Sequence, residues 1–322
     1  MMMSKSYGGY LPLELRQGDD YFSSLPSMRF NCANAAIDYV LEITDIKTVY
    51  VPYYMCPNIC ENFNSKDIQV IYYHVGEDLL PADEFPDQDA CVYVTDYFGV
   101  MSDKIDKLIA GLTNKYIIAD FCHAFYHKPV LKENIYCIYS ARKFFGVPDG
   151  SYLVNSNIVS DYEDDSTNFS SDYSSYLITS LEHGTDYSYS GKKEADSIIK
   201  QNKDKMSILA RRILNSIDYE AVRNTRQHNA CIYDKALGEI NRIHIEPGCS
   251  PYMYPFNAGT DIRASLVQEK VFTPTLWGQL LSDGFKGSVE RKLTEETVFL
   301  PVDQRYGSDD IENIIRIVRR YI

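Results

Sequence analysis

The sequence lacks the features that mark several large classes of protein. No apolar run among its 322 residues reaches membrane-spanning length, and no apolar stretch follows Met1 as a secretory signal would require. Lysine-rich blocks are also missing, and a net charge of -13 leaves little cationic surface for nucleic-acid phosphates. We therefore expect a protein that binds neither a membrane nor nucleic acid.

Cysteine is present without a recognisable pattern. The eight cysteines are scattered, which does not fit a disulfide framework and favours a reduced, cytoplasmic setting. Cys56 and Cys60 lie four apart, but no second pair or histidine group completes a zinc site, so we expect no metal. A Gly-x-Gly-x-x-Gly motif is absent too, which leaves a nicotinamide dehydrogenase unsupported.

Short strand-like runs alternate with helical stretches over the first half of the chain. We expect strands at 48–51, 70–73, 91–95, 116–119, 135–139 and 152–154, and helices at 35–41 and 103–110. This alternation predicts an α/β fold with a mostly parallel central sheet sandwiched by helices. Two long helices at 192–217 and 219–240 and a final amphipathic helix at 309–321 complete the pattern.

The chain is long enough for about two domains. We expect a large α/β domain over residues 1–200, followed by long helices and a smaller C-terminal α+β domain over residues 201–322. The N-terminal segment around Gly8 and Gly9 is expected to pack on the small lobe.

The stretch from Asp120 to Gly150 carries the strongest chemical signal. Asp120 ends a buried apolar strand, where a carboxylate is costly unless it meets a cation. Lys143 follows a second apolar strand, and a lysine in a partly desolvated pocket is a competent Schiff-base amine. The pyridinium nitrogen and aldehyde of pyridoxal phosphate (PLP) suit this acid and this amine. The alternative is that Lys143 is simply a solvated turn residue.

At these residues the chain resembles the DegT/DnrJ/EryC1/StrS family of PLP-dependent sugar aminotransferases. Asp120 and His123 fit the family's Asp-x-x-(His/Gln) motif, and Lys143 with Asp149-Gly150 fits its lysine and acid-glycine turn. The likeness covers most of the chain, because 51–54, 96–99 and 300–306 are similar to the family's Pro, Tyr-Phe-Gly and Leu-Pro segments.

The resemblance implies the fold of PLP-dependent transferases of fold type I. It also implies an enzyme that moves an amino group from an amino acid, commonly glutamate, to a keto group of a nucleotide-linked sugar through a Schiff base on Lys143. Asp120 would keep the cofactor's pyridine nitrogen protonated, and His123 would stack on its ring. A homodimer with shared active sites is a further implication.

Two departures from the family concern the phosphate of the cofactor. The family's Ser-Gly-Thr loop is replaced by Cys32, Ala33 and Asn34. Backbone amides at a helix start can still hold a phosphate, so Ala33 and Asn34 remain candidates. The family's serine five residues before the lysine is Ile138 here, and Ser140 is our substitute phosphate ligand unless it only caps the turn.

Several alternatives stay open at this point. His123 could be a packed core histidine, and Arg142 and Arg226 could be either anion ligands or structural arginines. A PLP-dependent dehydratase is a second enzyme hypothesis, although related sugar dehydratases carry histidine where this chain has Lys143. A catalytically degenerate binding or regulatory protein is a third, favoured by the altered phosphate loop and the short chain.

Overall fold

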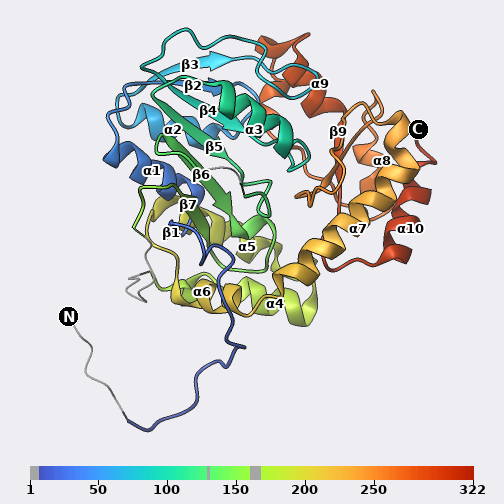
Figure 1. Cartoon of the computed structure of the whole chain (residues 1–322). Helices are drawn as coiled ribbons and strands as arrows, with labels where there is room; N and C mark the ends of the chain where they lie inside the picture. Colours follow the sequence, from blue (N-terminus) through green and yellow to red (C-terminus); the bar gives the residue numbers. More distant parts are fainter. Residues whose placement is uncertain (1–6, 129–130, 160–167) are drawn as a thin grey trace.

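A seven-stranded sheet forms the centre of the computed structural model, which describes residues 7–128, 131–159 and 168–322 (Figure 1). Its strands lie in the order β1-β7-β6-β5-β4-β2-β3. They are β1 (Ser27–Phe30), β2 (Thr48–Pro52), β3 (Gln69–Tyr73), β4 (Cys91–Thr95), β5 (Tyr116–Asp120), β6 (Ile135–Ser140) and β7 (Ser151–Val154). β2 to β6 run parallel, and β7 is antiparallel to both of its neighbours. The predicted strands and the mostly parallel sheet are confirmed, whereas β1 was not predicted.

Helices cover both faces of this sheet, as the sequence predicts. Side chains alternate along β4, so that Val92 joins the core formed with helix α3 (Ser102–Gly111). Tyr93 points the other way, into the core formed with α1 (Ala33–Ile43) and α2 (Pro57–Asn64). Each face therefore has its own apolar core.

The helix predicted over 192–217 is interrupted, and this prediction is wrong. Two helices share this region, α5 (Thr185–Gln201) and α6 (Ile208–Asn215), and α4 (Ser175–His183) precedes them. Between α5 and α6 the chain follows the outer edge of β1: the amide of Asn31 donates to the carbonyl of Asp204 at 2.9 Å, and Lys205 pairs with Phe30. An unpaired strand edge needs such partners, and helical periodicity does not reveal that need.

The second half of the chain begins with the long helix α7 (Tyr219–Leu237), on which α10 (Ser308–Val318) packs (Figure 1). Both helices were predicted. The other elements are β8 (Tyr254–Asn257), α8 (Arg263–Gln268), α9 (Val289–Glu296) and β9 (Thr297–Leu300), with β8 and β9 paired antiparallel. Short 3-10 turns are η1 (Ala141–Lys143), η2 (Ser170–Asp172), η3 (Gly238–Ile240), η4 (Gly278–Leu281) and η5 (Asp283–Phe285). The domain division near residue 200 stays a prediction.

The N-terminal segment does not pack on the small lobe where the structure describes it. It runs as an extended chain away from the sheet and helices (Figure 1), and the side chain of Tyr10 is 97% exposed. Composition alone cannot locate a segment with few apolar contacts. Among the described residues, no helix is both long and apolar enough to cross a membrane.

The turn after β4 touches the backbone that follows β5. Phe98 and Gly99 both have a left-handed backbone, with φ of 64° and 73°. A Cβ atom on Gly99 would lie 2.2 Å from the carbonyl oxygen of His123, which is closer than any real contact. Glycine is therefore required here for both its φ angle and its missing side chain.

We predict that Gly99→Ala lowers the free energy of unfolding by more than about 2 kcal/mol. Two costs add up: the strain of alanine in a left-handed backbone, and the overlap of its Cβ atom with the His123 carbonyl oxygen. Gly111→Ala, at the end of α3 with open space around it, is the matched control and should stabilise by about 0.4–1 kcal/mol. Urea unfolding curves of both variants measure the difference. Equal effects would contradict the close approach at Gly99.

Candidate active site

One cavity of about 550 Å³ lies where the carboxyl ends of the parallel strands meet the start of α1. Ligands of open α/β sheets bind at this edge. All six site residues predicted from the sequence line this cavity: Ala33, Asn34, Asp120, His123, Ser140 and Lys143. The structure thus brings the predicted residues together, while their roles remain proposals.

The carboxylate of Asp120 is buried and held by two hydrogen bonds. One oxygen accepts from the amide of Cys122 at 2.9 Å, and the other from the hydroxyl of Tyr93, on the neighbouring strand β4, at 2.7 Å. Burial, followed by the charge of Asp120, raises the pKa of Tyr93 well above its ordinary value, so this hydroxyl stays a donor. The carboxylate therefore has a set orientation at the edge of the cavity.

His123 is buried and its ring is neutral. Its Nδ1 atom accepts a hydrogen bond from the amide of Phe98 at 3.2 Å, which leaves Nε2 to carry the proton. Burial, and then the positive charge of Lys143, holds the pKa of His123 well below its usual range. The ring lies nearly parallel to that of Tyr252, with centroids 5.0 Å apart, and to Trp277 at 6.1 Å. His123 is thus a packed histidine that also forms a flat wall of the cavity.

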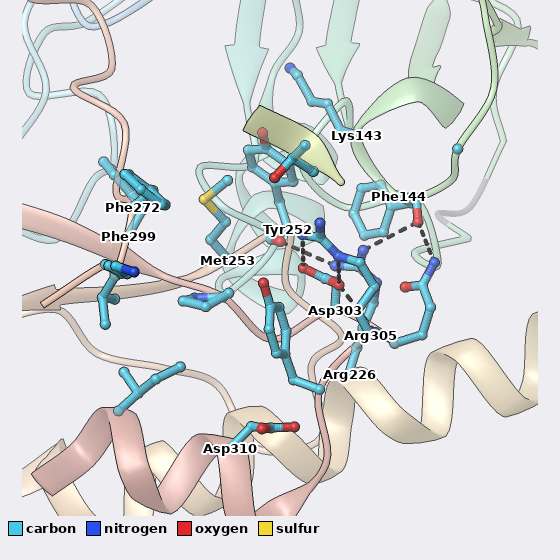
Figure 2. Close-up of a pocket in the computed structure, with 18 of the residues that line it drawn as sticks. Lys143, Phe144, Arg226, Tyr252, Met253, Phe272, Phe299, Asp303, Arg305 and Asp310 are labelled. Atoms are coloured by element: carbon cyan, nitrogen blue, oxygen red, sulfur yellow. Dashed lines mark hydrogen bonds and ion pairs between the residues drawn. The ribbon is translucent and has the colours of Figure 1, made fainter. Parts of the chain in front are cut away.

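Lys143 ends the 3-10 turn η1 that follows β6, and its side chain is half-buried. It borders both the first cavity and a second one of about 730 Å³. Figure 2 shows this second cavity with Lys143 at one end and Asp310 at the other. The Nζ atom lies 6.0 Å from the ring centre of Tyr252. Lys143 therefore stands between the two cavities.

Ser140 precedes this turn. Its side chain makes no capping hydrogen bond to η1 within the described residues. The alternative that it serves only to cap the turn is therefore not supported, and Ser140 lines the same cavity as Lys143.

The two arginines considered as anion ligands differ. Arg226 is buried, and its guanidinium donates to the carbonyls of Pro251, Tyr252 and Phe144 at 3.1, 3.1 and 3.3 Å. Figure 2 shows the bond to Phe144. It also lies over the ring of Phe144. Arg226 is thus a structural arginine that ties backbone segments together. Arg142, in contrast, lines the first cavity and forms an ion pair with Asp196 of α5.

Sequence reasoning missed Tyr93, Tyr252 and Trp277. Tyr93 could have been found, because alternation along β4 places it beside the strand that ends in Asp120. Trp277 is the only tryptophan of the chain and has a left-handed backbone with φ of 55° in a segment without regular periodicity. The contact of Tyr252 with His123 is long-range and leaves no local signal.

The cysteines show no disulfide and no metal-binding arrangement within the described residues. Cys32, Cys56 and Cys122 line the first cavity. Cys60 is buried in α2, with its sulfur 3.7 Å from that of Met55. None of these residues lies in a cluster of potential metal ligands.

Similarity to known proteins is visible in the fold and not in the sequence. No model of a known protein family matches the chain, and no relative is found among curated proteins. The structure is similar to that of DesV from S. venezuelae, solved in complex with a ketimine intermediate: the TM-score is 0.61 and identity 14%, over 92% of this chain and 84% of DesV.

Two further solved structures are similar over almost the whole chain. A DegT DnrJ EryC1 StrS aminotransferase from Brucella abortus gives a TM-score of 0.56 at 13% identity, covering 92% of this chain and 85% of that one. The E. coli GDP-4-keto-6-deoxy-D-mannose-3-dehydratase with bound hydrated PLP gives 0.58 at 14% identity, covering 90% and 87%.

These matches define the fold as that of PLP-dependent transferases of fold type I. Within that fold, the chain is similar to the DegT/DnrJ/EryC1/StrS sugar aminotransferases, so the resemblance noted in the sequence is confirmed at the level of the fold.

We predict that Tyr93→Phe costs about 1.5–3 kcal/mol of stability, because it removes a hydrogen bond to a buried carboxylate. Tyr73→Phe is the matched control: it removes an equally buried hydroxyl that donates to the uncharged carbonyl of Tyr93, at a cost of about 0.5–1.5 kcal/mol. Urea unfolding compares the two. A larger loss for Tyr73→Phe would contradict the view that the bond from Tyr93 to Asp120 is the stronger of the two.

We also predict a pH effect from His123. The pKa of His123 is lowered in the folded state. Below the unfolded pKa of about 6.5, the unfolded chain therefore binds a proton that the folded protein does not. The free energy of unfolding then falls with pH by at most about 1.4 kcal/mol per pH unit, whereas above this pKa it is unaffected. Between pH 7.5 and 5.5, His123→Gln should therefore lose less stability than the wild type. Unfolding curves at several pH values measure this.

The control for this pH effect is His183→Gln. This variant removes a histidine whose side chain is 63% exposed, so it tests whether the effect belongs to the buried imidazole of His123. An identical pH dependence in wild type and His123→Gln would show that the pKa of His123 is the same in the folded and unfolded states, and would contradict a lowered pKa.

Proposed function

We propose that this protein is a PLP-dependent aminotransferase that moves an amino group from an amino acid, with glutamate as the expected donor, to a keto group of a nucleotide-linked sugar. The observation that carries the proposal is the convergence of Asp120, His123 and Lys143 on one cavity beside the start of α1. Acid, flat ring and amine are the three protein groups that a pyridoxal ring requires.

The residues of the cavity fit the proposed cofactor. Each carboxylate oxygen of Asp120 uses one acceptor position for a protein donor and has a second left for a pyridinium N–H. The first amides of α1 have no partners within the helix, and Cys32 forms no side-chain capping bond to them. A cavity of about 550 Å³ also lies in the size range of small-molecule sites.

Each residue would have a distinct role. When bound, PLP supplies an electron sink that makes the Cα proton of an amino acid removable. Lys143 would hold the cofactor covalently. Once the amino donor displaces it, the free amine of Lys143 would take the proton from the donor's Cα and deliver it to the cofactor. Asp120 would keep the pyridine nitrogen protonated, and the neutral ring of His123 would stack on the cofactor and set its plane.

The remaining predicted residues would bind the phosphate group. Ala33 and Asn34 would offer their backbone amides and the positive end of the α1 dipole. The hydroxyl of Ser140 would donate from the end of β6. These contacts need no particular side chain at the helix start, so the departure from Ser-Gly-Thr is compatible with binding.

The structural relatives support both the cofactor and the class of acceptor. The E. coli enzyme was solved with hydrated PLP and is named for a GDP-linked keto sugar, and the Brucella protein is named an aminotransferase. A dehydratase therefore shares this fold. Because related dehydratases carry histidine at the position of Lys143, we favour amino transfer.

We further propose a homodimer with shared active sites and a reduced, cytoplasmic setting. The family resemblance supports the dimer, as do the exposed apolar side chains of α4 and α5, among them Leu181 at 87% and Tyr187 at 75% exposure. The eight free thiols support the reduced setting.

The experiment is the visible absorption spectrum of the protein incubated with PLP. We predict a band that depends on Lys143, is lost in Lys143→Ala, and bleaches when glutamate is added. Lys193→Ala removes an exposed lysine of α5 and is the matched control, which should keep the band.

Each other outcome has a clear meaning. A band that persists in Lys143→Ala would overturn the role of that lysine. A band that glutamate does not bleach would contradict glutamate-dependent amino transfer while keeping the cofactor. Absence of any band in the wild type would favour the non-catalytic binding protein.

A further inference from the structure

Arg142 stands directly before Lys143 and faces the same cavity as the start of α1. It belongs to the turn η1, and its side chain, 18% exposed, lines the cavity together with Cys32 and Ala33. A guanidinium and a helix N-terminus thus border the same cavity. Both features attract anions.

Arg142 and Lys192 share the carboxylate of Asp196. Asp196 of α5 forms an ion pair with Arg142, and the same carboxylate binds Lys192 through both oxygens at 2.6 Å. The buried carboxyl group of Asp149 is a second acid that interacts electrostatically with Arg142, so neither acid pairs with Arg142 alone. The pKa of Lys192 is lowered, first by burial and then by the charge of Arg142, as expected for crowded cations.

One N–H group of Arg142 also lacks an acceptor. Its Nε atom is buried and has no hydrogen-bond partner among the described residues. An unmet buried donor is costly, so an acceptor that reaches it would be bound favourably. A planar guanidinium matches the oxygens of a phosphate group in particular.

The hydroxyl that the family resemblance places five residues before the lysine is missing in this chain. Ile138 occupies that position, and its side chain is fully buried in the apolar core on the α1 face of the sheet. It can neither reach the cavity nor donate a hydrogen bond. Ser140 is the hydroxyl proposed above for the phosphate, and a guanidinium beside it would be a second side-chain donor.

We propose that Arg142, oriented by Asp196, is a phosphate-binding side chain of this cavity and acts beside Ser140 to make up for the hydroxyl missing at Ile138. The proposal rests on the proposed function for the source of the phosphate, which is PLP. Asp196 is a positioning residue, because it acts through the guanidinium that it orients.

The test compares the affinities for PLP and for pyridoxal, which has the same ring and aldehyde but no phosphate. Trp277 is the only tryptophan and lines the cavity, so quenching of its fluorescence reports binding of either compound. We predict that Arg142→Gln weakens PLP binding by about 10- to 150-fold and leaves pyridoxal binding within about 3-fold. Asp196→Asn should have a smaller effect of the same kind.

Two controls separate this role from general damage. Arg305→Gln changes an arginine that lines only the second cavity and is held by Asp303, so the ratio of the two affinities should stay at the wild-type value. Lys143→Ala should lower the affinity for both compounds and keep the preference for PLP. Inorganic phosphate should compete with PLP in the wild type and not in Arg142→Gln.

An unchanged ratio of PLP to pyridoxal affinity in Arg142→Gln would overturn this inference and leave the role of Lys143 intact. Equal losses for both compounds would also overturn it, because they indicate a structural effect. The wild type could also form no adduct at Lys143 while phosphate competition is still lost in Arg142→Gln. That combination would support the role of Arg142 and overturn the proposed function alone. A wild type that binds neither PLP nor phosphate would contradict both.

Discussion

The buried carboxylate of Asp120 is the constraint on which the site depends. A charge at the end of a buried strand is costly unless hydrogen bonds compensate for its lost hydration. Tyr93 on the adjacent strand and the amide of Cys122 provide two such bonds. The bond from Tyr93 joins β4 to the end of β5, so the pairing that stabilises the sheet also orients the acid.

The same edge of the sheet positions the other groups. The turn after β4 carries Phe98, whose amide donates to His123, and Gly99, whose missing side chain makes room for the His123 carbonyl. β6 runs parallel to β5 and leads into the turn that ends at Lys143. The neighbouring strands β5 and β6 thus deliver an acid, a neutral imidazole and an amine to one cavity, and the turn after β4 holds the imidazole in place.

The C-terminal part of the chain is joined to the site by hydrogen bonds to backbone carbonyls and by ring contacts. The carbonyl of Phe144, the residue after Lys143, accepts hydrogen bonds from Arg226 of α7 and from Gln304. Figure 2 shows Arg226 beside the carbonyl of Phe144. Arg226 also donates to the carbonyl of Tyr252, whose ring packs on His123. Arg226 therefore ties the turn that ends at Lys143 to the segment that carries Tyr252.

Much of this arrangement could be predicted, because it depends on local signals. The strands β2 to β7 have alternating or continuous apolar patterns, and Asp120, His123 and Lys143 occur at short motif spacings beside them.

What could not be predicted depends on contacts between distant segments. The end of α5 is set by pairing with β1, and the role of Arg226 is set by three carbonyls from two other parts of the chain. The exposure of the N-terminal segment, with side chains such as Tyr10 and Leu11, likewise cannot be predicted from hydrophobic periodicity, because it depends on how few apolar contacts the segment makes with the rest of the fold.

The central claim is that Lys143 is the residue that holds PLP in this fold. Borohydride reduction of the protein incubated with PLP, followed by proteolysis and peptide mass mapping, tests it most directly. The account predicts a phosphopyridoxyl group on the peptide that contains Lys143 and on no other lysine at stoichiometric loading. Labelling spread over surface lysines, with Lys143 unmodified, would contradict it.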